Sequence, residues 1–180
     1  MRTDSHDKFV EYVSARLPRL QRAAYLMCGD PHRAGDLVQS TLVNLYIQWR
    51  EAQLATNLDG YVYRILARRF IDEKRSAWAR VLLPGRLPDV PEPDRDPDID
   101  RDTVMAALRG LPRGQRAVIV LRYYGDLSVE DTAQALGCST GNVKSQCARG
   151  LAALREALTT TDSAKRLTTT TGSTTDTKSE

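Results

Sequence analysis

The sequence has few of the residues that bind metal ions or form disulfides. Its 180 residues include only two histidines, His6 and His32, and three cysteines, Cys28, Cys138 and Cys147. An odd number of cysteines at these spacings fits neither a disulfide framework nor a zinc site, and neither histidine stands at ligand spacing from a cysteine. We therefore expect reduced, mostly buried thiols, and we predict no metal site and no cofactor.

Long apolar runs are also missing. No stretch approaches the roughly 20 consecutive apolar residues that a membrane span requires, and residues 1–9 lack the apolar core of a signal peptide. Hydrophobic residues make up 41% of the chain and charged residues 27%, a balance typical of globular proteins. The sequence therefore predicts a cytoplasmic protein with no membrane partner.

The motifs of common catalytic sites are absent as well. The sequence contains no P-loop, no Gly-x-Ser-x-Gly elbow and no pair of histidines at metal-binding spacing. Isolated acids such as Asp36 and Asp72 fit helix caps and ion pairs better than catalysis. We therefore predict that the protein is not an enzyme.

What the sequence does contain is two helical blocks separated by a proline-rich acidic stretch. Apolar residues recur at helical spacing in both blocks, and no segment shows the period-two alternation of a strand. Residues 84–97 hold five prolines, and residues 86–102 carry seven acids against three arginines, a net charge of −4. Such a stretch cannot bury enough surface to fold alone.

These features predict an all-α protein with two small helical domains. A flexible acidic linker would join them, and a disordered C-terminal tail would follow, because ten of its 22 residues are threonine. The predicted segments are an N-terminal domain at 1–80, the linker at 81–102, a C-terminal domain at 103–158 and the tail at 159–180. Within the first domain, Pro18 predicts a break or a second start in the first helix.

The segment 128–158 has the features of a DNA-reading helix-turn-helix. Ser128 opens a helix with a capping-box-like start, Gly137 ends it, and Ser139 can cap a second helix. Small polar residues begin that second helix, whose first turn is the part of a recognition helix that meets base edges. The alternative is an ordinary helical hairpin with a solvated polar face. The residues of this segment predicted to contact duplex DNA are Ser139, Thr140, Gly141, Asn142, Lys144, Ser145 and Arg149.

A basic stripe lies ahead of the linker. Residues 64–80 carry six bases against two acids, a net charge of +4, and Arg64, Arg68 and Arg75 fall on one helical face. Positive charge beside aromatic rings is what unpaired DNA requires, because charge follows the phosphates and rings stack on bases. Taken alone, the segment favours the alternative of a helix with a solvated basic face, since two acidic neighbours neutralise part of the stripe.

The helix expected around 36–49 has two apolar stripes. Val43 and Ile47 lie on the side opposite the expected core stripe, which consists of Val38, Leu42, Leu45 and Trp49. Exposed apolar residues flanked by polar ones indicate docking to another protein. Burial of both stripes inside a small bundle is the alternative, and the sequence leaves it open.

Four motifs follow one another along the chain. Residues 36–42 read Asp-Leu-Val-Gln-Ser-Thr-Leu, and residues 61–68 read Tyr-Val-Tyr-Arg-Ile-Leu-Ala-Arg. A third motif opens with Leu-Pro at 111–112, and a fourth runs from Leu-Gly-Cys-Ser at 136–139 to Leu-Arg at 154–155. In this order they resemble the polymerase-binding helix, the promoter-melting helix, the entry to region four and the upstream-element reader of one family. That family is the extracytoplasmic-function group of the sigma-70 factors, which keeps only regions two and four.

The resemblance implies a transcription initiation factor. It would bind core RNA polymerase through the beta-prime clamp helices and the beta subunit, and direct promoter recognition and DNA melting. The minus-ten element would be bound partly as single strand and the minus-thirty-five element as duplex, and an anti-sigma factor is a conceivable further partner. The residues implied in polymerase binding are Asp36, Leu37, Gln39, Ser40, Val43, Asn44 and Ile47. Those implied in minus-ten binding are Asn57, Tyr61, Arg64, Arg68, Arg69, Lys74 and Arg75. The resemblance also adds Arg122 to the residues of minus-thirty-five binding.

The sequence departs from the family pattern at four positions. Ser40 replaces the usual acid of the docking motif, and Arg68 stands where asparagine is common. Asn142 stands where threonine is usual, and Gln146 where arginine is usual. These departures concern the residues that would set the polymerase contact and the promoter sequence.

A plain DNA-binding regulator of the response-regulator type is the competing hypothesis, because its helix-turn-helix has similar turn chemistry. Such a regulator needs a sensor or dimerisation domain, and the N-terminal block has no strand pattern for a receiver fold. A gel-shift assay separates the two hypotheses, since a regulator binds duplex promoter DNA alone and a sigma factor needs core polymerase.

Overall fold

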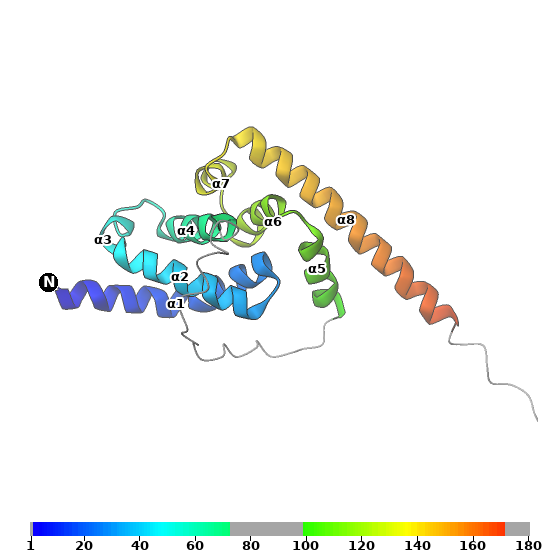
Figure 1. Ribbon diagram of the computed structural model, residues 1–180, viewed down its shortest axis with the longest axis horizontal. Coiled ribbons are helices and arrows are strands. Elements are labelled where there is room, and N and C mark those ends of the chain that lie inside the picture. The colour runs from blue at the N-terminus through cyan, green and yellow to red at the C-terminus, as the bar shows by residue number, and fades with distance from the viewer. Residues whose placement is uncertain (1, 73–98, 172–180) are drawn as a thin grey trace, which may run out of the picture.

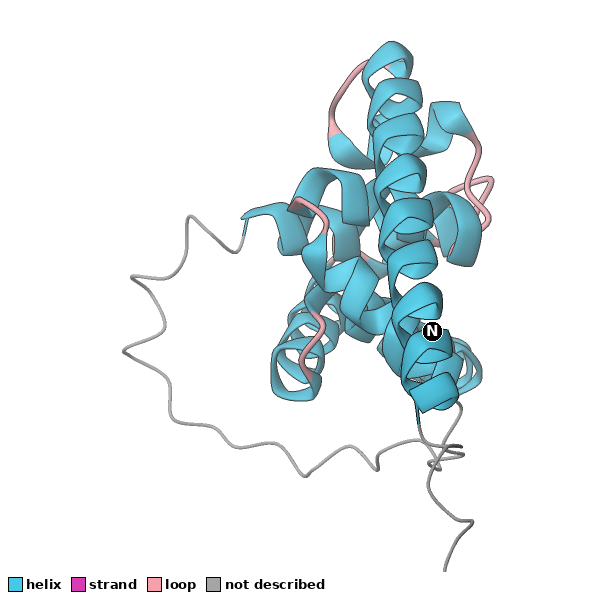
Figure 2. Cartoon of the chain, turned by 90° about the vertical axis from the view of Figure 1, so that its right-hand side faces the viewer, coloured by secondary structure: helices cyan, strands magenta, loops and turns pink. Residues whose placement is uncertain are grey.

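The computed structural model describes the backbone of residues 2–72 and 99–171 and the side chains of residues 5–72 and 101–161. Throughout these ranges the chain forms helices joined by turns, with no strand (Figure 2). The predicted all-α fold class is confirmed. Most of the predicted linker, together with Lys74, Arg75 and residues 172–180 of the predicted tail, lies outside the described residues.

The N-terminal domain contains α1 (Arg2–Cys28), α2 (Pro31–Ile47), α3 (Trp49–Ala52) and α4 (Leu58–Asp72). The break expected at Pro18 is wrong, because α1 runs through this residue without interruption. A proline inside a helix removes one backbone donor. Burial of Leu20, Ala24 and Met27 against the neighbouring helices offsets this loss.

Local side-chain chemistry sets the helix ends in this domain. Gly29 ends α1 in the left-handed conformation, with a φ of +70°, and Asp30 then caps α2 by accepting a hydrogen bond from the Arg33 N–H at 2.8 Å. Asn57 Oδ1 accepts the Gly60 N–H at 2.8 Å and so begins α4. A left-handed glycine, and two side-chain caps that lie within three residues of the groups they satisfy, therefore define these helix ends.

The C-terminal domain begins with α5 (Ile99–Gly110) and α6 (Arg113–Ile119), which continues into a π-helical turn, η2 (Val120–Tyr124). The helix-turn-helix follows as α7 (Val129–Leu136) and α8 (Thr140–Thr171). Ser128 Oγ accepts the Asp131 N–H at 2.9 Å, Gly137 has a φ of +64°, and Ser139 Oγ accepts the Asn142 N–H at 3.1 Å. The predicted helix-turn-helix is therefore confirmed as a structural unit.

Two predicted boundaries of this domain need correction. The first helix begins at Ile99, inside the segment predicted as linker, because alternating aspartates at its start favour a helix N-terminus. The last helix continues to Thr171, although the tail from residue 159 was predicted to be disordered. The hydroxyls of Thr159, Thr160 and Thr161 donate to carbonyls one turn back at 2.8–2.9 Å, so these polar side chains are satisfied within the helix.

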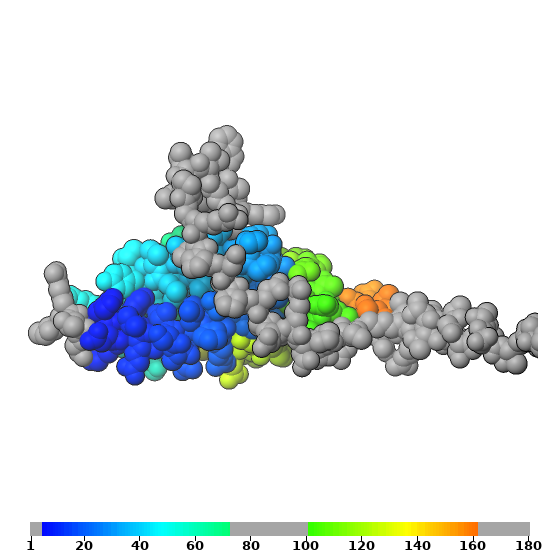
Figure 3. All heavy atoms as spheres, turned by 90° about the horizontal axis from the view of Figure 1, so that it is seen from below, coloured from blue at the N-terminus to red at the C-terminus, as the bar shows by residue number. Residues whose placement is uncertain are grey.

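One hydrophobic core extends through both domains. Its N-terminal part includes Leu66 and Phe70 of α4, and its C-terminal part includes Leu121 of η2 and Ala135 of α7. In Figure 1, α7 lies beside α4, with which it is in contact, and α6 lies between α4 and α5. Figure 3 shows from below that α5, in green, adjoins the blue atoms of the N-terminal domain. The two domains are therefore packed together.

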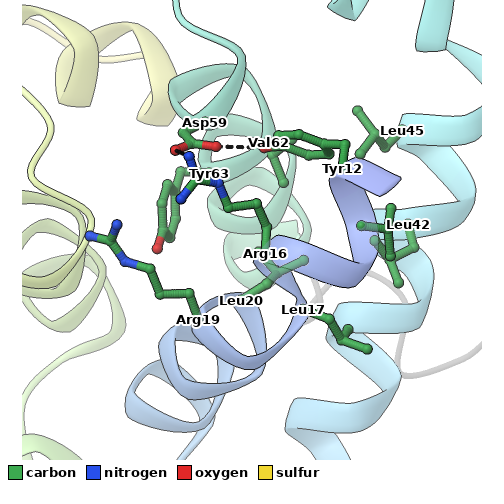
Figure 4. A pocket seen from close by; sticks show the side chains of 11 residues that line it. Tyr12, Arg16, Leu17, Arg19, Leu20, Leu42, Leu45, Asp59, Val62 and Tyr63 are labelled. Atoms are coloured by element: carbon green, nitrogen blue, oxygen red, sulfur yellow. Dashed lines mark hydrogen bonds and ion pairs between the residues drawn. The ribbon is translucent and has the colours of Figure 1, made fainter. Parts of the chain in front are cut away.

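A small cavity lies between α1, α2 and α4 (Figure 4). Its volume of about 20 Å³ suits roughly one water molecule and is too small for a cofactor. At its rim the Tyr12 hydroxyl donates to Asp59 Oδ1 at 2.7 Å, and the Arg16 guanidinium lies 3.2 Å from Asp59 Oδ2. These contacts tie α1 to the first turn of α4.

Truncation of a core side chain of α4 should destabilise the fold. Leu66 is fully buried, so Leu66→Ala should lower the free energy of unfolding by about 2–5 kcal/mol. Leu54 is 87% exposed, and Leu54→Ala is the control, with an expected change within about 0.5 kcal/mol. Urea unfolding measures both, and equal losses in the two variants would contradict the assigned core.

Alkaline pH should also destabilise the fold through Tyr12. Burial, and then the hydrogen bond to Asp59, raise the pKa of Tyr12 well above its ordinary value of 10.0. The unfolded chain therefore loses this phenol proton above pH 10 while the folded chain keeps it, so stability falls as the pH rises above 10. Tyr12→Phe should weaken this fall in urea unfolding measured below and above pH 10. An unchanged pH dependence in this variant would refute the role of Tyr12.

Candidate protein and nucleic-acid interfaces

The outer face of α2 presents apolar side chains to solvent. Val43 is 54% exposed and Ile47 is 73% exposed, whereas Leu45 of the core stripe is fully buried. Of the two alternatives left open by the sequence, the structure therefore shows that the second apolar stripe of this helix is exposed and not buried inside the bundle. We define the docking face as the exposed or half-exposed residues Asp36, Gln39, Ser40, Val43, Asn44 and Ile47.

Two residues of the polymerase-binding motif differ from the sequence-based prediction. Leu37 is buried in the core, so it supports α2 from beneath the docking face. Tyr46 is 56% exposed at the edge of this face and was not among the predicted contacts. The helical spacing of Tyr46 places it between the two stripes, which is why the apolar pattern did not single it out.

Aromatic packing fixes the end of α2. The Phe9 ring lies edge-on to Tyr46 at a centroid distance of 5.1 Å and to Trp49 at 5.2 Å. Trp49 Nε1 also donates to the Ser5 carbonyl at 2.9 Å. These contacts hold the start of α1 beside the docking face and fix the position of the end of α2.

A second group of predicted residues gathers at the start of α4. The Tyr61 hydroxyl donates to Gln48 Oε1 at 2.7 Å, and the Arg64 guanidinium lies 4.5 Å from the centre of the Tyr61 ring. Asn57 is exposed and caps the same helix. A ring, a guanidinium and an amide therefore lie together at one end of α4, a combination suited to bases and phosphates.

The rest of the basic stripe has a different environment. Arg68 donates to the carbonyls of Gln134 and Ala135, both at 3.3 Å, near the end of α7. Arg69 is exposed. Arg68 is exposed as well, but its donors are directed to α7, whereas Arg64 lies over the Tyr61 ring. The two arginines therefore have different partners, although their spacing places them on one face of the helix.

The recognition helix α8 presents its predicted face to solvent. Asn142, Lys144, Ser145 and Arg149 are exposed, and so are Ser139, Thr140 and Gly141 at its start. Val143, on the opposite side, is fully buried against Val118 and Ala133. Arg122 is half-buried and donates to the Leu127 carbonyl in the loop before α7.

Gly150 lets α8 approach α6. A Cβ atom at this position would lie 3.1 Å from Ile119 Cγ1, which is tighter than ordinary packing. Leu151 and Leu154 pack against the small core formed by Met105, Leu108, Leu111 and Ile119. Close packing of α8 on α6 and α5 therefore fixes the direction in which the recognition face points.

The cysteines and acids form no metal centre in the described part of the chain. Cys28 is buried, Cys138 and Cys147 are half-buried, and none of them forms a disulfide. No three side chains of histidine, cysteine, aspartate or glutamate are grouped for metal binding within the described residues. Among the helices of residues 2–72 and 99–171, none has the length and hydropathy required to cross a membrane.

Comparison with known proteins matches both domains. Residues 12–80 match the family model for sigma-70 region 2, and residues 101–154 match the family model for sigma-70 region 4. The two matches follow the order of the domains along the chain. They contain the docking face, α4 and the helix-turn-helix.

Curated relatives and a solved structure agree with this match. An RNA polymerase sigma-E factor of Streptomyces coelicolor is 36% identical over 86% of this chain and 88% of its own length. The ECF RNA polymerase sigma factor SigE of Mycolicibacterium smegmatis is 33% identical over 82% of this chain and 60% of its own length. The sigma factor RpoE of Bartonella quintana, solved in complex with the anti-sigma factor NepR, superimposes with a TM-score of 0.70 at 26% identity. This superposition covers 84% of our chain and 97% of that one.

Both sigma regions occur in the family's order, and the relatives from Streptomyces coelicolor and Mycolicibacterium smegmatis share 36% and 33% identity over most of the chain. The helix-turn-helix lies inside the region 4 match. The chain therefore belongs to the extracytoplasmic-function group of the sigma-70 family of RNA polymerase sigma factors.

Proposed function

We propose that this sigma factor binds core RNA polymerase through the docking face of α2, with the beta-prime clamp helices as its main partner. The exposure of Val43 and Ile47 carries this proposal, because apolar side chains at more than half exposure favour burial against a partner. The polar residues around them supply hydrogen-bonding groups for the rim of an interface. Further contacts would involve the beta subunit.

We propose that α4 and its approach bind the minus-ten element as it unpairs. The Asn57, Tyr61 and Arg64 group supports this, because its ring can stack on a base while its guanidinium meets a phosphate. Arg68, Arg69, Lys74 and Arg75 would extend the basic track along the strand. The polymerase would perform all the chemistry, and this protein would be no enzyme.

We propose that the exposed face of α8 reads the minus-thirty-five element in the major groove. Asn142 in the first turn and Arg149 two turns later can donate to base edges. The exposed side chains of Lys144 and Ser145 can contact the phosphates beside them. A cytoplasmic location follows from these partners.

An anti-sigma factor is a further proposed partner. The solved relative from Bartonella quintana forms a complex with the anti-sigma factor NepR, and it matches 84% of this chain. A test is co-purification of the full chain with a candidate inhibitor from its own organism, followed by loss of transcription.

Substitution of the docking face should abolish activity through loss of polymerase binding. Val43→Asp combined with Ile47→Asp replaces two apolar contacts of about 1.5–3 kcal/mol each, so binding to core polymerase should weaken at least about tenfold. Run-off transcription with purified core polymerase should fall in parallel. The control is Val104→Asp, at a 40% exposed valine on α5. Equal loss in the control, or full core binding by the double variant, would contradict the assignment.

Substitutions on the recognition face should change promoter preference. Asn142→Ala and Arg149→Ala should each alter preference at a particular base pair by about 1–3 kcal/mol. Lys144→Ala is the comparison, because loss of a phosphate contact weakens all sequences alike. Run-off transcription from a library of upstream elements measures this. An unchanged preference profile in both base-reading variants would exclude groove reading by these side chains.

A further inference from the structure

We propose that Tyr123, Lys144 and Arg155 form a phosphate-binding track along one side of α8, in which Cys147 positions the Tyr123 hydroxyl. The track binds phosphate oxygens of one strand of the duplex that the recognition face reads. This inference rests on the proposed role of α8 in minus-thirty-five recognition. It adds two binding residues, Tyr123 and Arg155, to those already proposed for this element.

The Tyr123 side chain projects into solvent from an uncommon turn. It belongs to η2, a π-helical turn, and turns of this kind often occur at functional sites. Val120 and Leu121 at the start of the turn are buried in the core, whereas Tyr123 is 63% exposed. A ring at this exposure contributes little to the fold. Its position therefore indicates a partner outside the chain, since tyrosine joins an apolar ring to a hydrogen-bonding group.

The thiol of Cys147 holds the Tyr123 hydroxyl beside α8. Cys147 Sγ donates to the Tyr123 hydroxyl oxygen at 3.8 Å. Cys147 itself packs against both small cores of the C-terminal domain, which include Ile119 and Val143, so packing fixes the position of its thiol. Because the phenol oxygen accepts this contact, the phenol proton remains available to an external acceptor.

Positive charge surrounds this hydroxyl. Hydrogen bonding to Cys147 raises the pKa of Tyr123, and the nearby guanidinium groups of Arg122 and Arg155 oppose this shift. The phenol therefore stays protonated at neutral pH. A neutral donor near two positive charges suits a phosphate oxygen, which accepts hydrogen bonds and carries negative charge.

The turn directs its two polar side chains differently. The Arg122 guanidinium donates to the Leu127 carbonyl, so this donor is engaged within the domain. The next residue, Tyr123, faces solvent. Tyr123 is therefore the residue of η2 that can reach a phosphate, while Arg122 contributes its charge.

Helical spacing places the three donors of the track along one side of α8. Cys147 follows Lys144 by three residues, so these side chains are neighbours on the helix surface, and the Tyr123 hydroxyl lies near both. Arg155 follows Lys144 by eleven residues, which is close to three turns and about 16 Å. Lys144 and Arg155 are both exposed.

This side of α8 adjoins the base-reading side. Successive residues of a helix lie about 100° apart, so Lys144 lies next to Ser145 around the axis. A helix in the major groove has base edges in front of it and a phosphate strand on each side. One strand carries a phosphate for about every 3.4 Å of duplex axis. Donors spread over about 16 Å can therefore meet separate phosphates of one strand.

The test uses holoenzyme assembled from core polymerase and the full chain, with a labelled duplex promoter fragment that the wild-type holoenzyme transcribes. Affinity is measured in the cold, before the duplex melts. Tyr123→Phe removes the hydroxyl and keeps the ring, so affinity should fall about two- to tenfold. Arg155→Gln removes a charge, so it should weaken binding and also reduce the slope of log affinity against log salt concentration by about one. Neither variant should change the preference among upstream elements.

Each substitution has a matched control. Tyr124→Phe removes the hydroxyl of the neighbouring, half-buried tyrosine, and Arg101→Gln removes an equal charge from the start of α5. Both controls should bind the fragment as the wild-type chain does. Wild-type affinity and wild-type salt dependence in both Tyr123→Phe and Arg155→Gln would overturn the track.

The positioning role of Cys147 needs a double-variant cycle. Cys147→Ala should weaken binding as Tyr123→Phe does, and the two substitutions together should be no weaker than Tyr123→Phe alone. Cys147→Ser keeps a donor and should restore binding. Losses that add would show that Cys147 acts on the fold and not through Tyr123, and would overturn its positioning role.

A measurement on the wild-type chain needs no substitution. Bound duplex should protect Cys147 from alkylation by iodoacetamide, with the site identified by mass spectrometry. Equal alkylation of Cys147 with and without the promoter fragment would place the DNA elsewhere and overturn the track.

The base-reading variants Asn142→Ala and Arg149→Ala, measured in parallel, report separately on the proposed function. A changed preference in these variants together with wild-type affinity in the track variants would overturn the track alone. An unchanged preference together with weakened track variants would overturn base reading by α8 and retain the track.

Discussion

Helix C-termini must find partners for their last carbonyls, and this requirement organises the meeting of the two domains. The ends of α1, α4, η2 and α7 all lie near the boundary, where arginine side chains from the opposite domain bind them. Contacts of this kind are directional, whereas the apolar seam beneath them is not. The arginines therefore decide how the domains sit on each other, and burial of Phe70 and Leu121 supplies much of the favourable free energy.

Helices α2 and α8 each have a buried side that packs within the protein and an exposed side that is available to other molecules. In α2, Leu37 and Leu45 are buried, while Val43 and Ile47 on the opposite side face solvent. In α8, Val143 is buried while its neighbours Asn142 and Lys144 are exposed. Each helix thus has one side that packs in the core and another side that faces solvent. The solvent-facing sides carry residues of the motifs that resemble the sigma family.

Much of this architecture could be predicted from the sequence because capping is local. Asp30, Asn57 and Ser128 act as caps within three residues, so a short window suffices to recognise them. Pro18 and the threonines from residue 159 misled the prediction, since tertiary packing and hydroxyl bonds to the preceding turn override their ordinary preferences. The exposure of Val43 and the partners of Arg68 could not be predicted, because periodicity does not show which face meets which neighbour.

Helix α8 carries the predicted recognition face at its start and continues without interruption over 32 residues, or about 48 Å. Figure 1 shows that its C-terminal part extends beyond the other helices. Close contact with α6 at Gly150, together with Leu151 and Leu154, holds α8 to the rest of the domain. From Gly150 the helix runs ten residues back to Thr140 and 21 residues on to Thr171, so the projecting arm is about twice as long as the arm that carries the predicted recognition face. A force applied at the projecting end therefore acts on the contact at Gly150 through the longer of two lever arms.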